Sequence, residues 1–164
     1  VAMSFGNHED FSQRGGISFE GTWLRDMPCP IFNCGGLLTI KYGSQEYQIA
    51  MTHRFFGSSR FNPTNACKRL IEHVYPDADV SYLGHSHIRE HLSFQRGGKS
   101  RLAIVGGRYK MDDEFGPKRG MGAGGQMGGL CLMLRGDKKE AFVMESVSDA
   151  REYLETLEKV KRGY

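Results

Sequence analysis

The feature that most restricts the fold of this chain is a recurring unit, a short apolar run followed by a turn that carries histidine. Three such runs, each of strand length, are Val1 to Phe5, Tyr47 to Met51 and Val80 to Leu83. The turns after them read Gly6-Asn7-His8-Glu9, Thr52-His53 and Gly84-His85-Ser86-His87. Strand-end loops are where a rigid scaffold presents reactive side chains, so we expect any functional site in these turns.

The remaining pattern predicts hairpins and helices around these strands. The runs 37–42 and 46–51 flank the turn Gly43-Ser44-Gln45, and further hairpins are expected around 96–99 and 136–138. Asn62-Pro63 predicts the start of a helix whose apolar face is Ala66, Leu70, Ile71 and Val74. A C-terminal helix is expected from an N-cap at Ser148 to Arg162, with Tyr153, Leu154, Leu157 and Val160 facing inward. The order of units predicts an α/β fold, a two-sheet β-sandwich flanked by helices.

Composition sets the outer limits of the interpretation. The 164 residues, 39% hydrophobic and 25% charged, suit a single domain over 1–164. No run approaches the roughly 20 apolar residues of a membrane helix, and no signal peptide is apparent. We therefore expect a cytoplasmic protein with no membrane partner. The four cysteines have no zinc-finger spacing and are expected to be reduced and mostly buried.

The histidines differ in how strongly they indicate a metal site. A single histidine such as His53 is more often structural than a ligand. His85 and His87 are separated by one small residue, and in extended backbone both side chains would lie on one side and converge on neighbouring ions. The turn at Asn7 and His8 adds an amide oxygen and a proton donor.

In this combination the chain resembles the calcineurin-like metallophosphoesterase family. The pattern of that family is Asp-x-His, Gly-Asp-x-x-Asp, Gly-Asn-His-Asp/Glu, a single His and Gly-His-x-His, and the last three motifs occur here in order between Gly6 and His87. Among family members, the segment 57–64 most resembles phage or bacterial proteins.

The resemblance implies a role for each matching residue. Asn7, His53 and His85 would bind one metal ion and His87 the other. His8 would act as general acid and Glu9 would orient it. Two ions would clamp a phosphate and activate a water that attacks phosphorus in line. Separately, Arg54 and Arg89 follow proposed ligands closely and are candidates for substrate contact.

The first two motifs of the family do not precede Gly6, so the chain reads as the incomplete C-terminal part of a metallophosphoesterase domain. The resemblance implies two divalent ions in an intact protein and one or none in this chain alone. Imidazole and amide ligands suit Mn, Fe, Zn or Ni.

Three functions remain open from the residues. The first is hydrolysis of a phosphodiester or phosphomonoester, with nucleic acid as one candidate substrate. The second is a non-catalytic scaffold or binding module of the same fold. The third, a protein phosphatase, has no support beyond the shared chemistry. The sequence indicates neither the substrate nor the oligomeric state.

Overall fold

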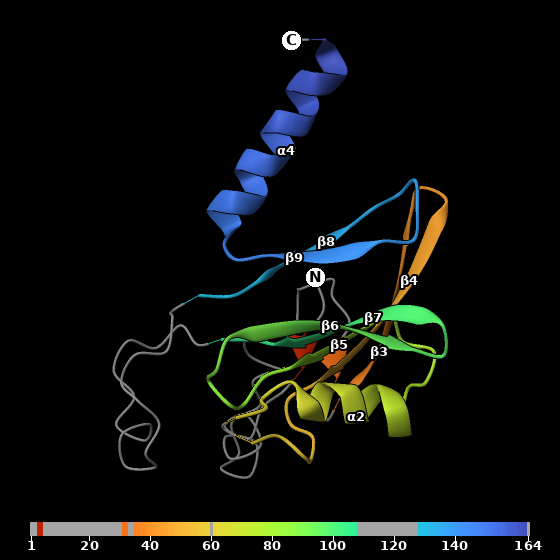
Figure 1. Cartoon of the computed structure of the whole chain (residues 1–164), viewed down its shortest axis with the longest axis vertical. Helices are drawn as coiled ribbons and strands as arrows, with labels where there is room; N and C mark the ends of the chain where they lie inside the picture. Colours follow the sequence, from red (N-terminus) through yellow and green to blue (C-terminus); the bar gives the residue numbers. More distant parts are fainter. Residues whose placement is uncertain (1–2, 5–30, 33–34, 60, 108–127, 164) are drawn as a thin grey trace.

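The computed structural model describes residues 3–4, 31–32, 35–59, 61–107 and 128–163. Within these ranges the chain is mixed α/β (Figure 1). The strands are β1 (Met3–Ser4), β2 (Ile31–Phe32), β3 (Gly36–Tyr42), β4 (Gln45–Thr52), β5 (Val80–Leu83), β6 (Glu90–Arg96), β7 (Lys99–Val105), β8 (Cys131–Leu134) and β9 (Ala141–Met144), and the helices are α2 (Asn65–His73) and α4 (Val147–Arg162). None of the helices in these ranges is long and apolar enough to cross a membrane.

A five-stranded sheet in the order β3-β4-β5-β7-β6 forms the centre of the fold. Strands β4, β5 and β7 run parallel, whereas β3 and β6 pair antiparallel at the two edges. The predicted hairpins β3–β4 and β6–β7 are confirmed. In the second, Gly97 and Gly98 have φ angles of +58° and +71°, the left-handed pair that a two-residue hairpin turn requires.

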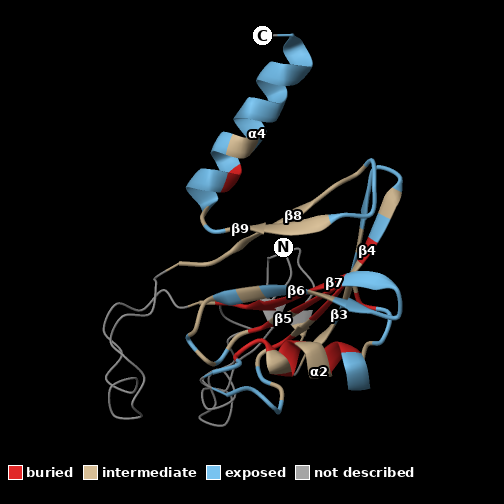
Figure 2. Cartoon of the chain, in the orientation of Figure 1, coloured by how far each residue is buried: buried red, intermediate tan, exposed pale blue. Residues whose placement is uncertain are grey.

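Two layers cover this sheet. Helix α2 packs on one face, where Leu70 and Ile71 meet Ala50 and Val105. The hairpin β8–β9 packs on the other face, against a group that includes Ile49. Figure 2 shows the buried residues concentrated in the central strands and the facing side of α2. The predicted α/β class is therefore confirmed, as a five-stranded mixed sheet with a small two-stranded sheet and two helices in the described ranges, whereas the two-sheet sandwich stays a prediction.

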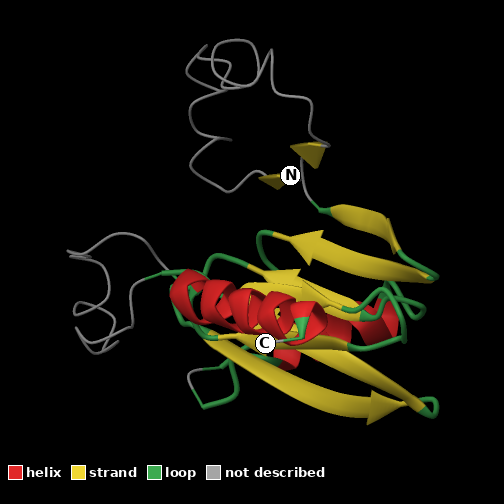
Figure 3. Ribbon diagram, turned by 90° about the horizontal axis from the view of Figure 1, so that it is seen from above, coloured by secondary structure: helices red, strands yellow, loops and turns green. Residues whose placement is uncertain are grey.

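The sheet β1–β2 is a separate short parallel pair, Met3 beside Ile31 and Ser4 beside Phe32. It lies beyond the β3 edge of the larger sheet (Figure 3). The first predicted strand, Val1 to Phe5, is thus confirmed for Met3–Ser4, the part that the structure describes.

Helix α2 starts later than predicted. Its N-cap is Thr64, without a side-chain cap hydrogen bond, so the prediction of an Asn62 cap was wrong. Asn62 instead closes a turn in which its backbone N–H donates to Ser59 Oγ at 3.1 Å. Val74 is the C-cap and 47% exposed, so it does not belong to the buried face.

Cys67 lies on the buried face of α2. Its thiol donates to the Ile104 carbonyl oxygen at 3.1 Å, and burial raises the pKa of this thiol to about 12. The expectation of a reduced, buried thiol is confirmed at this position.

Helix α4 differs most from the prediction. Its N-cap is Ser146, whose Oγ accepts from the Asp149 N–H at 3.1 Å, and not Ser148. Only Ala150 is buried along the helix, whereas Leu154 and Val160, predicted to face inward, are 49% and 66% exposed. The amphipathic pattern made a helix, but the body of the protein covers only its first turns.

A tyrosine hydroxyl connects β8–β9 to the central sheet. Tyr47 is 1% exposed, and its hydroxyl reaches the carbonyl oxygens of Arg135 at 2.7 Å and Glu140 at 2.9 Å. The Glu140 N–H donates back to the same oxygen at 3.0 Å. One hydroxyl therefore satisfies backbone groups on both sides of the β8–β9 turn.

Tyr47→Phe is expected to lower the free energy of unfolding by about 1–3 kcal/mol, because several partly buried hydrogen bonds to the backbone are lost together. Urea denaturation followed by circular dichroism measures the change. The matched control is Tyr42→Phe on the neighbouring strand, where the side chain is 58% exposed and the change should stay within about 0.5 kcal/mol. Equal effects of the two substitutions would contradict this role.

Candidate metal centre

The carboxyl ends of the three parallel strands lie level with one another. Thr52 at the end of β4 pairs with Leu83 at the end of β5, and Leu83 pairs with Val105 at the end of β7. Backbone bonds continue this register past the strands, from Gly84 N–H to Thr52 O at 3.4 Å and from Gly106 N–H to Leu83 O at 2.7 Å. The turns after these strands therefore lie together along the edge that the carboxyl ends of β4, β5 and β7 form, and not along the edge strands β3 and β6. The carboxyl ends of the strands are the usual place for a site in open α/β sheets.

At this edge His53 and His85 meet. His85 Nδ1 lies 3.0 Å from His53 Nε2, and the two rings meet edge to face with centroids 4.9 Å apart. His53 is half-buried and His85 is exposed. A direct hydrogen bond needs one nitrogen to carry the proton and the other to accept it, so the pair is set by the choice of tautomer.

The spacing of these nitrogens also fits one shared ion. With zinc–nitrogen bonds of about 2.0–2.1 Å, two ligand nitrogens lie about 2.9 Å apart at a right angle and about 3.3 Å apart at the tetrahedral angle. The observed 3.0 Å falls within that interval. Among the described residues no group of three or more His, Cys, Asp and Glu side chains converges.

The backbone of the 84–87 turn is not extended, contrary to the reasoning applied to His85 and His87. Both histidines are in the left-handed region, with φ angles of +66° and +56°. The Ser86 N–H donates to Gly84 O at 2.8 Å, which closes the turn tightly. A non-glycine residue in this region costs about 1–2 kcal/mol, and such strain is typical of functional sites.

The other expected ligands are less defined. His87 is exposed two residues beyond His85 on the same turn, and its role as a ligand stays a prediction. Asn7, His8 and Glu9 lie outside the residues that the structure describes.

The two arginines differ in their surroundings. Arg54 is exposed directly after His53, and its carbonyl oxygen accepts from Thr52 Oγ1 at 3.3 Å. Arg89 pairs with Glu145, with Nη2 at 3.1 Å from the carboxylate and Nη1 at 3.0 Å from the carbonyl oxygen. Its side chain is only 12% exposed, so Arg89 links the loop before β6 to the end of β9. The pairing was not predicted from the sequence, although Glu145 directly follows β9 as His53 directly follows β4.

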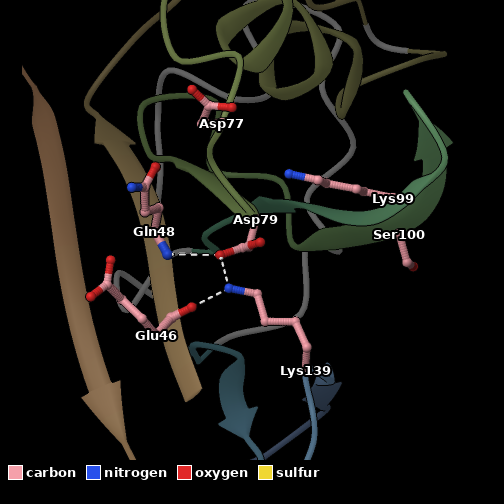
Figure 4. A pocket seen from close by; sticks show the side chains of 7 residues that line it. All are labelled: Glu46, Gln48, Asp77, Asp79, Lys99, Ser100 and Lys139. Atoms are coloured by element: carbon pink, nitrogen blue, oxygen red, sulfur yellow. Dashed lines mark hydrogen bonds and ion pairs between the residues drawn. The ribbon is translucent and has the colours of Figure 1, made fainter. Parts of the chain in front are cut away.

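A hollow of about 410 Å³ lies at the other end of the parallel strands, near the amino ends of β5 and β7 (Figure 4). Two of its charged groups are paired with each other, since Asp79 Oδ2 accepts from Lys139 Nζ at 2.7 Å and also from the Gln48 N–H at 2.8 Å. These bonds hold β8–β9 to the sheet. The hollow is therefore separate from the histidine pair, which follows the carboxyl ends of β4 and β5.

Comparison with known proteins identified no relative. No protein-family model, curated protein or solved structure matches the chain.

The left-handed backbone at His87 predicts an unusual order of stabilities. His87→Gly and His87→Ala both remove the imidazole, but only glycine adopts this backbone without strain, so the glycine variant should be more stable by about 1 kcal/mol. Chemical denaturation of both variants measures the difference.

Ser86, between the two histidines, is the control position. Its φ angle is not positive, so the Ser86→Gly variant should be no more stable than the Ser86→Ala variant. A His87→Ala variant as stable as His87→Gly would show that the turn adopts a different backbone in solution.

Proposed function

We propose that this chain carries part of a metal-dependent phosphoesterase site on a metallophosphoesterase-like two-sheet fold. The observation that supports the proposal is the 3.0 Å approach of His85 Nδ1 to His53 Nε2 at the carboxyl ends of β4 and β5. Two histidines 32 residues apart in the sequence meet at the edge where ligands bind in sheets of this kind.

The chemistry of the pair favours a divalent transition metal. Neutral imidazole suits Mn, Fe, Zn or Ni. A half-buried His53 beside an exposed His85 leaves one side of such an ion open to solvent and substrate. The strained turn at His85 and His87 is consistent with ligands held in place at a cost in stability.

The proposed division of labour follows the motifs. His53 and His85 hold an ion together with Asn7, and His87 binds a second ion. A divalent ion supplies a Lewis acid for a phosphoryl oxygen. His8 gives a proton to the leaving oxygen, and Glu9 orients His8. Arg54, exposed beside His53, contacts the phosphate ester, whereas Arg89 is engaged by Glu145 and acts there only if that pair opens. Nucleic acid is one candidate substrate.

The competing proposal is a non-catalytic member of the same fold that serves as a binding module. One observation favours it, namely that the described residues provide only two converging ligands. The two proposals differ in whether phosphate-ester hydrolysis accompanies metal binding.

Metal binding tests the histidine pair directly. Calorimetric titration with Zn²⁺ should show a site whose affinity falls roughly tenfold or more in His53→Ala and in His85→Ala, because each substitution removes one ligand. His73→Ala is the matched control, since His73 is exposed at the end of α2 and should leave the affinity unchanged. Equal affinity in all variants would exclude His53 and His85 as ligands.

Catalysis is tested separately at His8. In a form of the protein extended to carry the two missing motifs, hydrolysis of bis-p-nitrophenyl phosphate with Mn²⁺ should fall about 10²- to 10⁴-fold in His8→Ala, the usual effect of removing a general acid. Metal affinity should remain, because His8 is not a proposed ligand. Metal binding by that extended form without any hydrolysis would favour the binding module, and hydrolysis unaffected by His8→Ala would assign the proton donor elsewhere.

A further inference from the structure

Helix α4 extends away from the rest of the molecule. It rises from the end of β9, and most of its length contacts neither sheet (Figure 1). Its base is anchored by Ala150, which is 7% exposed, and by Tyr153, whose ring meets Phe142 edge to face with centroids 5.6 Å apart. Beyond this point the helix surface is exposed (Figure 2).

The exposed part of α4 carries an apolar stripe. Val147, Leu154, Leu157 and Val160 are 72%, 49%, 38% and 66% exposed. Their spacings of seven, three and three residues place them on one side of a helix. Val147, Ala150, Leu154 and Leu157 also follow the alternating three- and four-residue spacing of a coiled-coil seam, of which the body of this chain already covers Ala150. The apolar face of α4 thus continues beyond the base of the helix, the only part that the rest of the protein covers.

The charged side chains beside the stripe are arranged so that two copies of α4 can pair opposite charges. Arg151 and Glu158 are seven residues apart and border the same edge of the stripe. If a second α4 lies antiparallel, a two-fold axis near Leu154 and Leu157 places Arg151 opposite Glu158 of the second copy, and the reverse pair forms by symmetry. A parallel arrangement sets this edge against Tyr153 and Val160, where no opposite charge is present.

The same charges disfavour a lipid surface as the occupant. Helix α4 carries as many acidic as basic side chains: Asp149, Glu152, Glu155 and Glu158 against Arg151, Lys159, Lys161 and Arg162. A helix without net positive charge gains no electrostatic attraction to anionic lipid.

We propose that α4 is a self-association helix, through which two copies of this chain form an antiparallel dimer along the stripe of Val147, Leu154, Leu157 and Val160. The proposal does not depend on the metal centre, because the stripe and its charges are on a different element. Arg151 and Glu158 now make pairs within their own helix, with Glu155 at 2.7 Å and Arg162 at 3.8 Å. These pairs are exposed, so exchanging partners on association costs little.

The apolar stripe is tested by sedimentation equilibrium of the full chain. The unmodified chain should show a concentration-dependent monomer–dimer equilibrium, and the double variant Leu154→Asp, Leu157→Asp should remain monomeric. Far-ultraviolet circular dichroism establishes that the variant is folded. A monomer at every concentration reached, or a dimer that persists in the folded double variant, would overturn the proposal.

Charge reversal tests the antiparallel geometry and stays informative if the leucine variant fails to fold. Arg151→Glu or Glu158→Arg alone turns both symmetric attractions into repulsions and should weaken dimerisation roughly tenfold, whereas the two together should restore it. Glu152→Lys and Lys159→Glu, also seven residues apart but on the opposite face, are the matched controls and should leave the affinity unchanged.

Failure of the double reversal to restore the dimer would overturn the antiparallel pairing. Co-sedimentation with phosphatidylcholine–phosphatidylserine vesicles that depends on Leu154 and Leu157 would assign the stripe to lipid and overturn the proposal as well.

Discussion

The parallel register of β4, β5 and β7 is the constraint on which the rest of the structure depends. Because Thr52, Leu83 and Val105 end at the same level, the turns that follow them are neighbours in space. This alignment brings His53 to His85 across 32 residues of sequence. A shift of one residue in the β4–β5 pairing would turn every side chain of the shifted strand to the other face and would also separate the two rings.

At the other end of the strands, where β5 and β7 begin, buried polar groups maintain this register. Arg101, 5% exposed at the start of β7, donates to the carbonyl oxygens of Asp77 at 2.9 Å and Pro76 at 3.1 Å, and also to that of Ala78. These bonds join the entry of β5 to β7, while Tyr47 and Asp79 fasten the β8–β9 hairpin to the same end of the sheet. The amino ends of the strands are therefore held together by paired polar groups, whereas the carboxyl ends carry the two histidines.

Local signals predicted the elements better than their packing. The glycine turns at Gly43 and Gly97-Gly98 specify tight hairpins, and both hairpins are where we expected them. The start of α2 and the cap of α4 were misplaced by two residues each, Thr64 in place of Asn62 and Ser146 in place of Ser148. Serine, threonine and asparagine cap helices comparably well, so the choice among nearby candidates depends on turns that the sequence does not reveal, such as the one that uses Asn62.

The sequence by itself determined which residues could form a site, since the histidines after strand-length apolar runs are a property of the order of residues. Tertiary structure alone decided that His53 and His85 meet, because their distance depends on strand pairing between segments far apart in the chain. It also decided the left-handed backbone of His85 and His87, which a tight turn imposes against local preference. The exposure of Leu154 on α4 is another such outcome: periodicity defines an apolar face, but only the neighbouring elements determine whether anything covers it.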